Sequence, residues 1–194
     1  GCFCCRFPDL LTAVLTLRDQ VAPDVILAEP VGSCTDIAAT VLRPLRAYHG
    51  AVVTIAPLSV LADPHRTLDA FVPAVAYLHH KQLAEAEIIV LSKADTLTPP
   101  QRQHQLALLH QHHPQQHIVP IAHGDDASID AWLHLVRQQP ADPRLLDIDY
   151  GTYADAEAAL GWLNARVTLN SDQPDRKSTR LNSSHANISY AVFC

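Results

Sequence analysis

The nine residues EIIVLSKAD, Glu87–Asp95, join a short, uninterrupted apolar run to a charged exit. Runs of this length that are rich in β-branched residues are typical of strands buried on both faces of a parallel sheet. In open α/β sheets, ligands bind beyond the carboxyl ends of the strands, which is where Lys93 and Asp95 follow. The stretch therefore predicts a central buried strand with a binding edge at its end.

Similar apolar runs and helical patterns alternate along most of the chain. Strands are predicted at residues 24–29, 51–56, 87–92 and 117–122. Helices are predicted at residues 9–20, 36–48, 68–82, 100–113 and 128–137. Strict alternation of strand and helix favours right-handed crossovers. The pattern predicts an α/β fold with a doubly wound, mostly parallel sheet.

The character of the sequence changes after residue 139. LLDIDY predicts a strand at 145–150, and the following residues predict a helix at 152–165 and a strand at 166–170. The last segment is rich in Ser and Asn, lacks helical periodicity and is similar to vector-derived sequence. The predicted units are a partial nucleotide-binding domain at 1–139, the start of a small α+β domain at 140–174, and a non-native disordered tail at 175–194.

The composition limits the classes of partner. The chain has 194 residues, 48% of them hydrophobic, and a formal net charge of −6. An acidic chain without a basic stripe argues against a nucleic-acid partner. No run of 18 apolar residues occurs, which argues against a membrane partner, and no signal-peptide pattern opens the chain. We expect a cytoplasmic protein.

Three of the five cysteines, Cys2, Cys4 and Cys5, fall within the opening GCFCC. In a reducing compartment, clustered thiols more often bind metal than form structural cross-links. Three thiolates with an open fourth position suit capture and release of a metal ion. The alternatives are a structural zinc site completed by a distant His, and simple burial. Cys34 is a possible further ligand, or a small buried apolar residue.

The segment Ser92-Lys93-x-Asp95 predicts recognition of guanine. A carboxylate at Asp95 can accept hydrogen bonds from both N1 and N2 of guanine, which adenine cannot donate. The Lys93 stem can lie against the base, and Ser92 stands where the usual motif has Asn. A charged turn between strand and helix is the alternative.

Two other loops offer weaker signals. Glu29-x-x-Gly32 follows a predicted strand, where an acidic residue can hold the Mg²⁺ shell and a Gly N–H can approach a terminal phosphate. A simple charge at a strand end is the alternative. Ala122 and His123 follow the strand predicted at 117–122, where a backbone N–H can meet the guanine O6.

The order of these parts resembles the CobW-like GTPases, relatives of the HypB and UreG metallochaperones. GCFCC, KQLAEAEIIVLSKADTL and DYGTYADAEAALGWLNA carry the resemblance, which covers roughly residues 1–170. It implies a P-loop NTPase-like fold and a GTP-dependent metal chaperone for Zn²⁺ or Co²⁺, with GTP and Mg²⁺ bound and a client metalloprotein as partner. A homodimer is one assembly open to such a protein. The implied roles are metal binding by Cys2, Cys4 and Cys5; switch residues Glu29 and Gly32; and nucleotide contacts from Ser92, Lys93, Asp95, Ala122 and His123.

The sequence departs from the family pattern in two ways. It contains no G-x-x-x-x-G-K-[ST] motif, which lies upstream of the cysteines in the family. We therefore expect a fragment that lacks the first βα unit and does not hydrolyse GTP. Also, no Asp follows the strand predicted at 51–56. The alternative function is a non-catalytic metal-binding or interaction module that retains the fold.

Overall fold

A three-stranded parallel sheet forms the centre of the protein. The computed structural model describes residues 2–66, 71–138, 140–160, 162–169 and 186–193. The strands are β1 (Ser59–Ala62), β2 (Ile88–Leu91) and β3 (His117–Pro120), in the order β1-β2-β3. Residue Ile88 pairs with both Ser59 and His117. All four residues of β2 are buried, which confirms the strand predicted from the EIIVLSKAD stretch.

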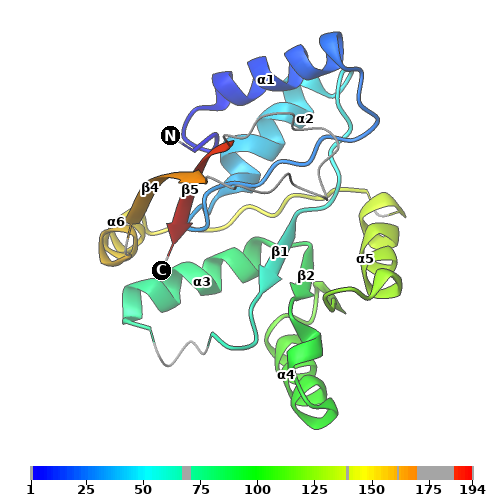
Figure 1. Cartoon of the computed structure of the whole chain (residues 1–194), viewed down its shortest axis with the longest axis vertical. Helices are drawn as coiled ribbons and strands as arrows, with labels where there is room; N and C mark the ends of the chain where they lie inside the picture. Colours follow the sequence, from blue (N-terminus) through cyan, green and yellow to red (C-terminus); the bar gives the residue numbers. More distant parts are fainter. Residues whose placement is uncertain (1, 67–70, 139, 161, 170–185, 194) are drawn as a thin grey trace.

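Two helices connect the strands of this sheet, α3 (Pro73–Glu85) between β1 and β2 and α4 (Pro99–His112) between β2 and β3, and α5 (Asp126–Gln138) follows β3. Figure 1 shows α3 and α5 on opposite sides of β1 and β2. Trp132 of α5 packs against the core of β2 and β3, and its indole N–H donates to Ser59 Oγ at 3.0 Å. The fold is α/β and P-loop NTPase-like, as predicted.

The N-terminal helices form a second apolar cluster. They are α1 (Phe7–Gln20), the π-helical turn η1 (Ala38–Leu42) and α2 (Arg43–His49). The wide turn has a local cause, because Pro44 has no N–H to donate to Thr40 and the Arg43 N–H bonds back to Ala38. Buried residues from η1 and α2 pack against the opening cysteines and phenylalanines of the chain; this cluster includes Cys34, Ile37, Val41, Leu45, Cys2, Phe3, Cys4 and Phe7.

Two predicted strands are wrong. Residues 24–29 and 51–56 have no strand structure. Val25 and Leu27 are 72% and 84% exposed, and no strand of the described sheet pairs with them. An apolar run becomes a strand only where a neighbouring strand satisfies its backbone groups. The second strand forms instead at β1, which begins three residues after the end of the predicted run at residue 56.

The segment before residue 150 also differs from prediction. The strand predicted at 145–150 is absent. Side chains of α3 satisfy the backbone of this segment instead, because Lys81 donates a hydrogen bond to the Asp147 carbonyl and the Tyr77 hydroxyl accepts one from the Asp149 N–H. The Asp149 side chain accepts from Gly151 N and Thr152 N and so caps α6 (Tyr150–Ala159).

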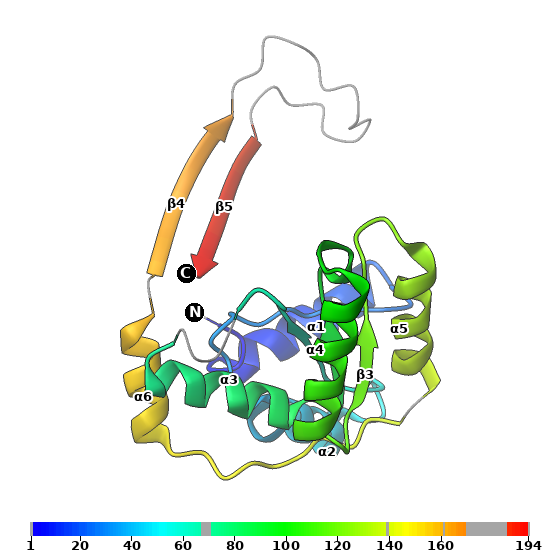
Figure 2. The ribbon, with the colours of Figure 1, turned by 90° about the horizontal axis from the view of Figure 1, so that it is seen from below.

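After α6, residues 162–165, predicted as the end of a helix, belong to a strand, whereas the strand predicted at 166–170 is confirmed over residues 166–169. β4 (Trp162–Leu169) pairs antiparallel with β5 (Ala186–Phe193). Figure 2 shows that this hairpin extends away from the helices and the parallel sheet. β5 falls within the segment predicted as a tail. The rest of that segment, 175–185 and Cys194, lies outside the described residues, as do Gly1 and residues 67–70, which include the first three residues of the helix predicted at 68–82.

Candidate functional site

Three cysteine sulfurs meet where the opening turn contacts the loop before η1. Cys34 Sγ lies 2.9 Å from Cys2 Sγ and 2.7 Å from Cys4 Sγ. Hydrogen bonds from Cys5 N to the Cys2 carbonyl (3.2 Å) and from Arg6 N to the Phe3 carbonyl (3.1 Å) close the opening turn. Local turn geometry thus aims Cys2 and Cys4 at a residue that is about thirty positions away in the chain.

The structure groups the cysteines differently from the predicted set. Cys2, Cys4 and Cys34 have their sulfurs within 4.8 Å of one another. Cys5 is exposed, and its sulfur lies 3.7 Å from Cys4 Sγ. Cys34, considered only as a possible ligand, therefore lies at the centre of the cluster, and Cys5 lies at its margin. The metal-ligand set itself stays a prediction.

The pKa values of the three thiols are shifted in different directions. Burial opposes ionisation of Cys2, but hydrogen bonds from Cys34 and Cys4 outweigh it and lower the pKa of the Cys2 thiol. Burial raises the pKa of Cys4 to about 12 and also raises the pKa of Cys34. The arrangement favours one thiolate at Cys2 that receives hydrogen bonds from the two protonated thiols.

The donor set fits a thiophilic divalent metal. All four cysteines described are free thiols. With Zn–S bonds of about 2.3 Å in tetrahedral geometry, two thiolates lie roughly 3.8 Å apart. Cys4 and Cys34 therefore need to separate by only about 1 Å to admit an ion. Soft thiolates of this kind suit a thiophilic ion better than a hard one such as Mg²⁺.

Helix α3 holds the loop that carries Cys34. Gln82 Nε2 donates to the carbonyl of Gly32 (2.8 Å) and to that of Cys34 (3.0 Å). The buried carboxylate of Glu85 accepts hydrogen bonds from the N–H groups of Asp36 (3.0 Å) and Ala38 (2.6 Å). Burial raises the pKa of Glu85 to about 7. Sequence reasoning missed both residues, because their partners lie about fifty positions earlier in the chain.

The predicted switch residues occupy an open part of this loop. Glu29 is exposed and, since residues 24–29 are not a strand, it does not lie at a strand end. Gly32 is exposed, with its carbonyl bonded to Gln82. Their predicted contact with Mg²⁺ and phosphate stays a prediction.

The predicted nucleotide-contacting residues gather at the carboxyl edge of the sheet. Ser92 follows β2, and its N–H and hydroxyl both donate to the Ala62 carbonyl at 2.9 and 3.0 Å. Asp95 Oδ1 accepts from the N–H of His123 at 3.1 Å, which joins the loops after β2 and β3. This hydrogen bond is the main cause of the lowered pKa of Asp95. Ala122 N donates to Ser128 Oγ at 3.1 Å.

An acidic residue at this edge was missed by the sequence reading. Asp63 directly follows β1 and pairs with Lys93, with 2.7 Å between Oδ2 and Nζ. Lys93 has a left-handed backbone, with φ of 52°. The expectation that no Asp follows the second strand is wrong, because the strand is β1 rather than residues 51–56. The signal was present as an apolar run, SVLA, followed by Asp.

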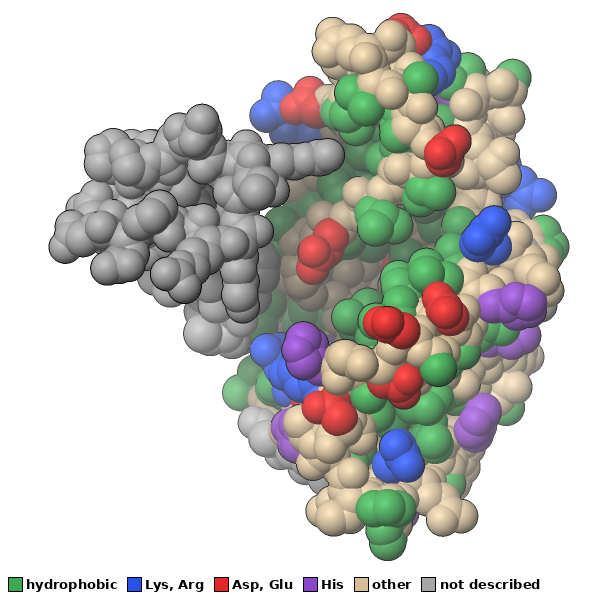
Figure 3. Space-filling model, turned by 45° about the vertical axis from the view of Figure 1, so that its right-hand side comes forward, with side chains coloured by type: hydrophobic (Ala, Val, Ile, Leu, Met, Phe, Trp, Pro, Cys, Tyr) green, Lys and Arg blue, Asp and Glu red, His purple; other side chains and the backbone are tan. Residues whose placement is uncertain are grey.

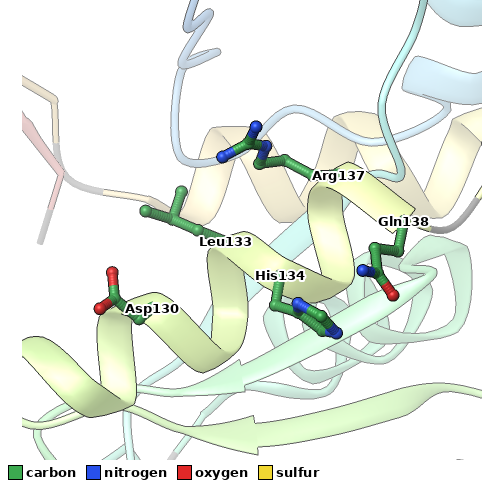
Figure 4. A pocket seen from close by; sticks show the side chains of 5 residues that line it. All are labelled: Asp130, Leu133, His134, Arg137 and Gln138. Carbon is green, nitrogen blue, oxygen red and sulfur yellow. The ribbon is translucent and has the colours of Figure 1, made fainter.

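The remaining surface contains a hollow and a mixture of charged side chains. A hollow of about 510 Å³ on α5 is lined by Asp130, Leu133, His134, Arg137 and Gln138, none of which is a predicted site residue. Figure 4 shows these five side chains along α5. On the face in Figure 3, acidic, basic and histidine side chains are interspersed. Among the described residues, no helix is long and apolar enough to cross a membrane.

Comparison with known proteins identifies the family. Residues 1–120 match the family described as CobW/HypB/UreG, nucleotide-binding domain. No curated protein and no solved structure matches the chain. The match covers more than half of the 194 residues and includes the cysteine cluster, β1, β2 and the Ser92–Asp95 segment. This chain belongs to the CobW/HypB/UreG family, whose members bind nucleotide and metal.

Proposed function

We propose that this protein is a GTP-dependent metal chaperone that carries zinc or cobalt. Guanine nucleotide binds at the edge formed by Ser92, Lys93, Asp95, Ala122 and His123. The thiol cluster carries the metal ion and passes it to a client metalloprotein. Glu29 and Gly32 act with Mg²⁺ as the switch, in a cytoplasmic protein that acts as a homodimer.

One observation carries the proposal. Helix α3 contacts the cysteine loop through Gln82 and Glu85, and only two residues separate its end from β2, whose own end leads into Ser92–Asp95. A movement of the nucleotide-reading segment is therefore transmitted through a short, buried connection to the loop that holds Cys34. Coupling between two sites requires such an element with contacts to both.

The test measures cobalt affinity with and without guanine nucleotide. GTP or GDP is added with Mg²⁺ at millimolar concentration, because the chain lacks the phosphate-cradling motif. We expect the Co²⁺ dissociation constant to change by about fivefold or more, and the nucleotide affinity to change by the same factor. Adenine nucleotides, which serve as the control, should leave it unchanged.

The second candidate function is a metal-binding or interaction module without nucleotide hydrolysis. Such a module would use only the thiol cluster of Cys2, Cys4 and Cys34, whose sulfurs lie within 4.8 Å of one another. Cobalt binding that is indifferent to every nucleotide would favour this module. Absence of any thiolate–cobalt absorption would overturn both functions.

A further inference from the structure

A closed ring of hydrogen bonds surrounds Lys93 at the carboxyl edge of the sheet. Asp63 Oδ2 accepts from Lys93 Nζ at 2.7 Å, and Asp63 Oδ1 accepts from the backbone N–H of His65 at 3.0 Å. His65 Nε2 lies 2.6 Å from Thr96 Oγ1, and the Thr96 hydroxyl donates to the Lys93 carbonyl at 2.7 Å. The loop after β1 therefore holds Lys93 by its side chain directly and by its backbone through Thr96.

The Thr96 hydroxyl sets the direction of the hydrogen bonds in this ring. A hydroxyl has one proton to donate, and the Lys93 carbonyl can only accept it. His65 must therefore donate from Nε2 to Thr96 Oγ1. Each donor in the ring then meets an acceptor, so the four contacts are compatible with one another.

The backbone of Lys93 is held in an uncommon conformation. Its φ of 52° and ψ of 33° are left-handed, which residues with a Cβ adopt at a steric cost. Such residues persist where the surrounding structure holds them, and they gather at functional sites. The ring supplies that restraint, and the left-handed turn directs the chain from β2 toward Asp95.

The two charged side chains of the ring differ in exposure. Asp63 is 20% exposed and Lys93 is 58% exposed. The hydrogen bond from Lys93 is the main cause of the lowered pKa of Asp63, so this carboxylate is ionised at neutral pH. Both oxygens of Asp63 accept hydrogen bonds within the ring, whereas much of the Lys93 side chain remains accessible to a ligand.

We infer that Asp63 is a positioning residue for guanine recognition, which anchors the Lys93 ammonium and so fixes the apolar stem of Lys93 as a wall against the face of the base. The inference rests on the guanine binding of the proposed function and adds a residue that does not touch the base. Asp95 is oriented separately, by the N–H of His123 at 3.1 Å. Asp95 reads the edge of the base, so Asp63 affects affinity without affecting base choice.

The experiment is a saturation-transfer NMR titration of the 194-residue chain and its variants with guanosine and inosine. Inosine lacks the N2 amino group, so the ratio of the two affinities reports how the edge of the base is read. Asp63→Asn keeps an oxygen for the His65 N–H but loses the charge that anchors Lys93. We expect both nucleosides to bind about threefold to tenfold more weakly, because the Lys93 side chain must then be ordered on binding. The affinity ratio should not change.

A Lys93→Met background tests whether Asp63 acts through Lys93. Methionine keeps an unbranched apolar stem without the ammonium, so adding Asp63→Asn to Lys93→Met should cause no further loss of guanosine affinity. A full additional loss in the double variant overturns the assignment. Unchanged guanosine affinity in Asp63→Asn alone, or a changed guanosine-to-inosine ratio, also overturns it.

Two measurements separate positioning from other effects. The urea unfolding midpoint of Asp63→Asn should change little, because an exposed ion pair contributes little to stability. Asp130→Asn alters an exposed carboxylate on α5 and should leave both nucleoside affinities unchanged. If the unmodified chain binds guanosine no better than adenosine, guanine recognition itself fails, which is a different result from loss of the Asp63 effect alone.

Discussion

The side chain of Asp95 accepts a hydrogen bond from the backbone N–H of His123 at 3.1 Å, which ties together the loops after two neighbouring strands. A second bond, from Ala94 N to the Ile121 carbonyl at 3.0 Å, strengthens the same junction. The Asp95 carboxylate is therefore oriented before any ligand binds. Orientation in advance lowers the entropy lost when the carboxylate engages a base.

Replacement of Asp95 should change base preference. Asp95→Asn converts one hydrogen-bond acceptor into a donor, so guanosine binding should weaken by about tenfold or more. Xanthosine, which presents an acceptor at the corresponding position, should bind better than before. Saturation-transfer NMR on the 194-residue chain with guanosine, xanthosine and adenosine measures this. Asp130→Asn, an exposed change on α5, is the matched control. Equal binding of guanosine and adenosine by the unmodified chain would contradict the assignment.

Metal affinity should rise steeply with pH. Cys4, with a pKa of about 12, and Cys34, with a raised pKa, are protonated at neutral pH and must lose their protons to ligate a metal. Release of at least these two protons per ion predicts a gain of about 100-fold or more in apparent affinity per pH unit. Competition with a chelator between pH 6 and 8 measures the slope. A pH-independent affinity would show that these thiols are not ligands.

The buried carboxylate of Glu85 should make stability depend on pH. Its folded pKa, about 7, lies above its ordinary value of 4.5 because of burial. Its stabilising contribution is therefore complete below pH 4.5 and lost as pH rises through 7, a difference of up to about 3 kcal/mol.

Glu85→Gln isolates this effect, because glutamine does not ionise. The free energy of unfolding of the variant, relative to the unmodified protein, should increase between pH 5 and pH 8. Urea unfolding at both pH values gives the comparison. A difference that does not change with pH would contradict the prediction.

The centre of β2 should be the most sensitive apolar position of the sheet. Ile89 is fully buried, whereas Leu61 of β1 is 63% exposed. Ile89→Ala should lower the free energy of unfolding by about 2–5 kcal/mol, through lost burial and the cavity left behind. Leu61→Ala removes a similar side chain and should cost much less. Comparable losses at the two positions in urea unfolding would mean that β2 is not the core strand.

The 194-residue chain should not turn over GTP at the rate of an intact GTPase. Positioning and charge stabilisation of the phosphates supply nearly all of phosphoryl-transfer catalysis. The printed sequence has no G-x-x-x-x-G-K-[ST] motif to provide them. A phosphate-release assay checks this prediction, with the Asp95→Asn variant as a background control. Steady release that Asp95→Asn abolishes would show that another segment binds the phosphates.

The sequence alone determined the central strand and the elements that follow it. Ile88–Leu91 is short, apolar and rich in β-branched residues, which is typical of a strand whose two faces are covered by the helices of a parallel α/β sheet. The helices at α1, α4 and α5 were also predictable within a few residues, because their proline and polar boundaries act locally. The gathering of Ser92, Lys93 and Asp95 at one edge followed from their position after a strand.

Tertiary structure decided whatever depends on a distant partner. Residues 24–29 have the composition of a strand but no neighbour in the described sheet, so their backbone is not paired. Cys34 joins Cys2 and Cys4 because α3 and α6 hold its loop through Gln82, Glu85 and Glu157. Those hydrogen bonds span about fifty to more than 120 residues. Local periodicity carries no information about contacts at that separation, since they arise only when helices pack.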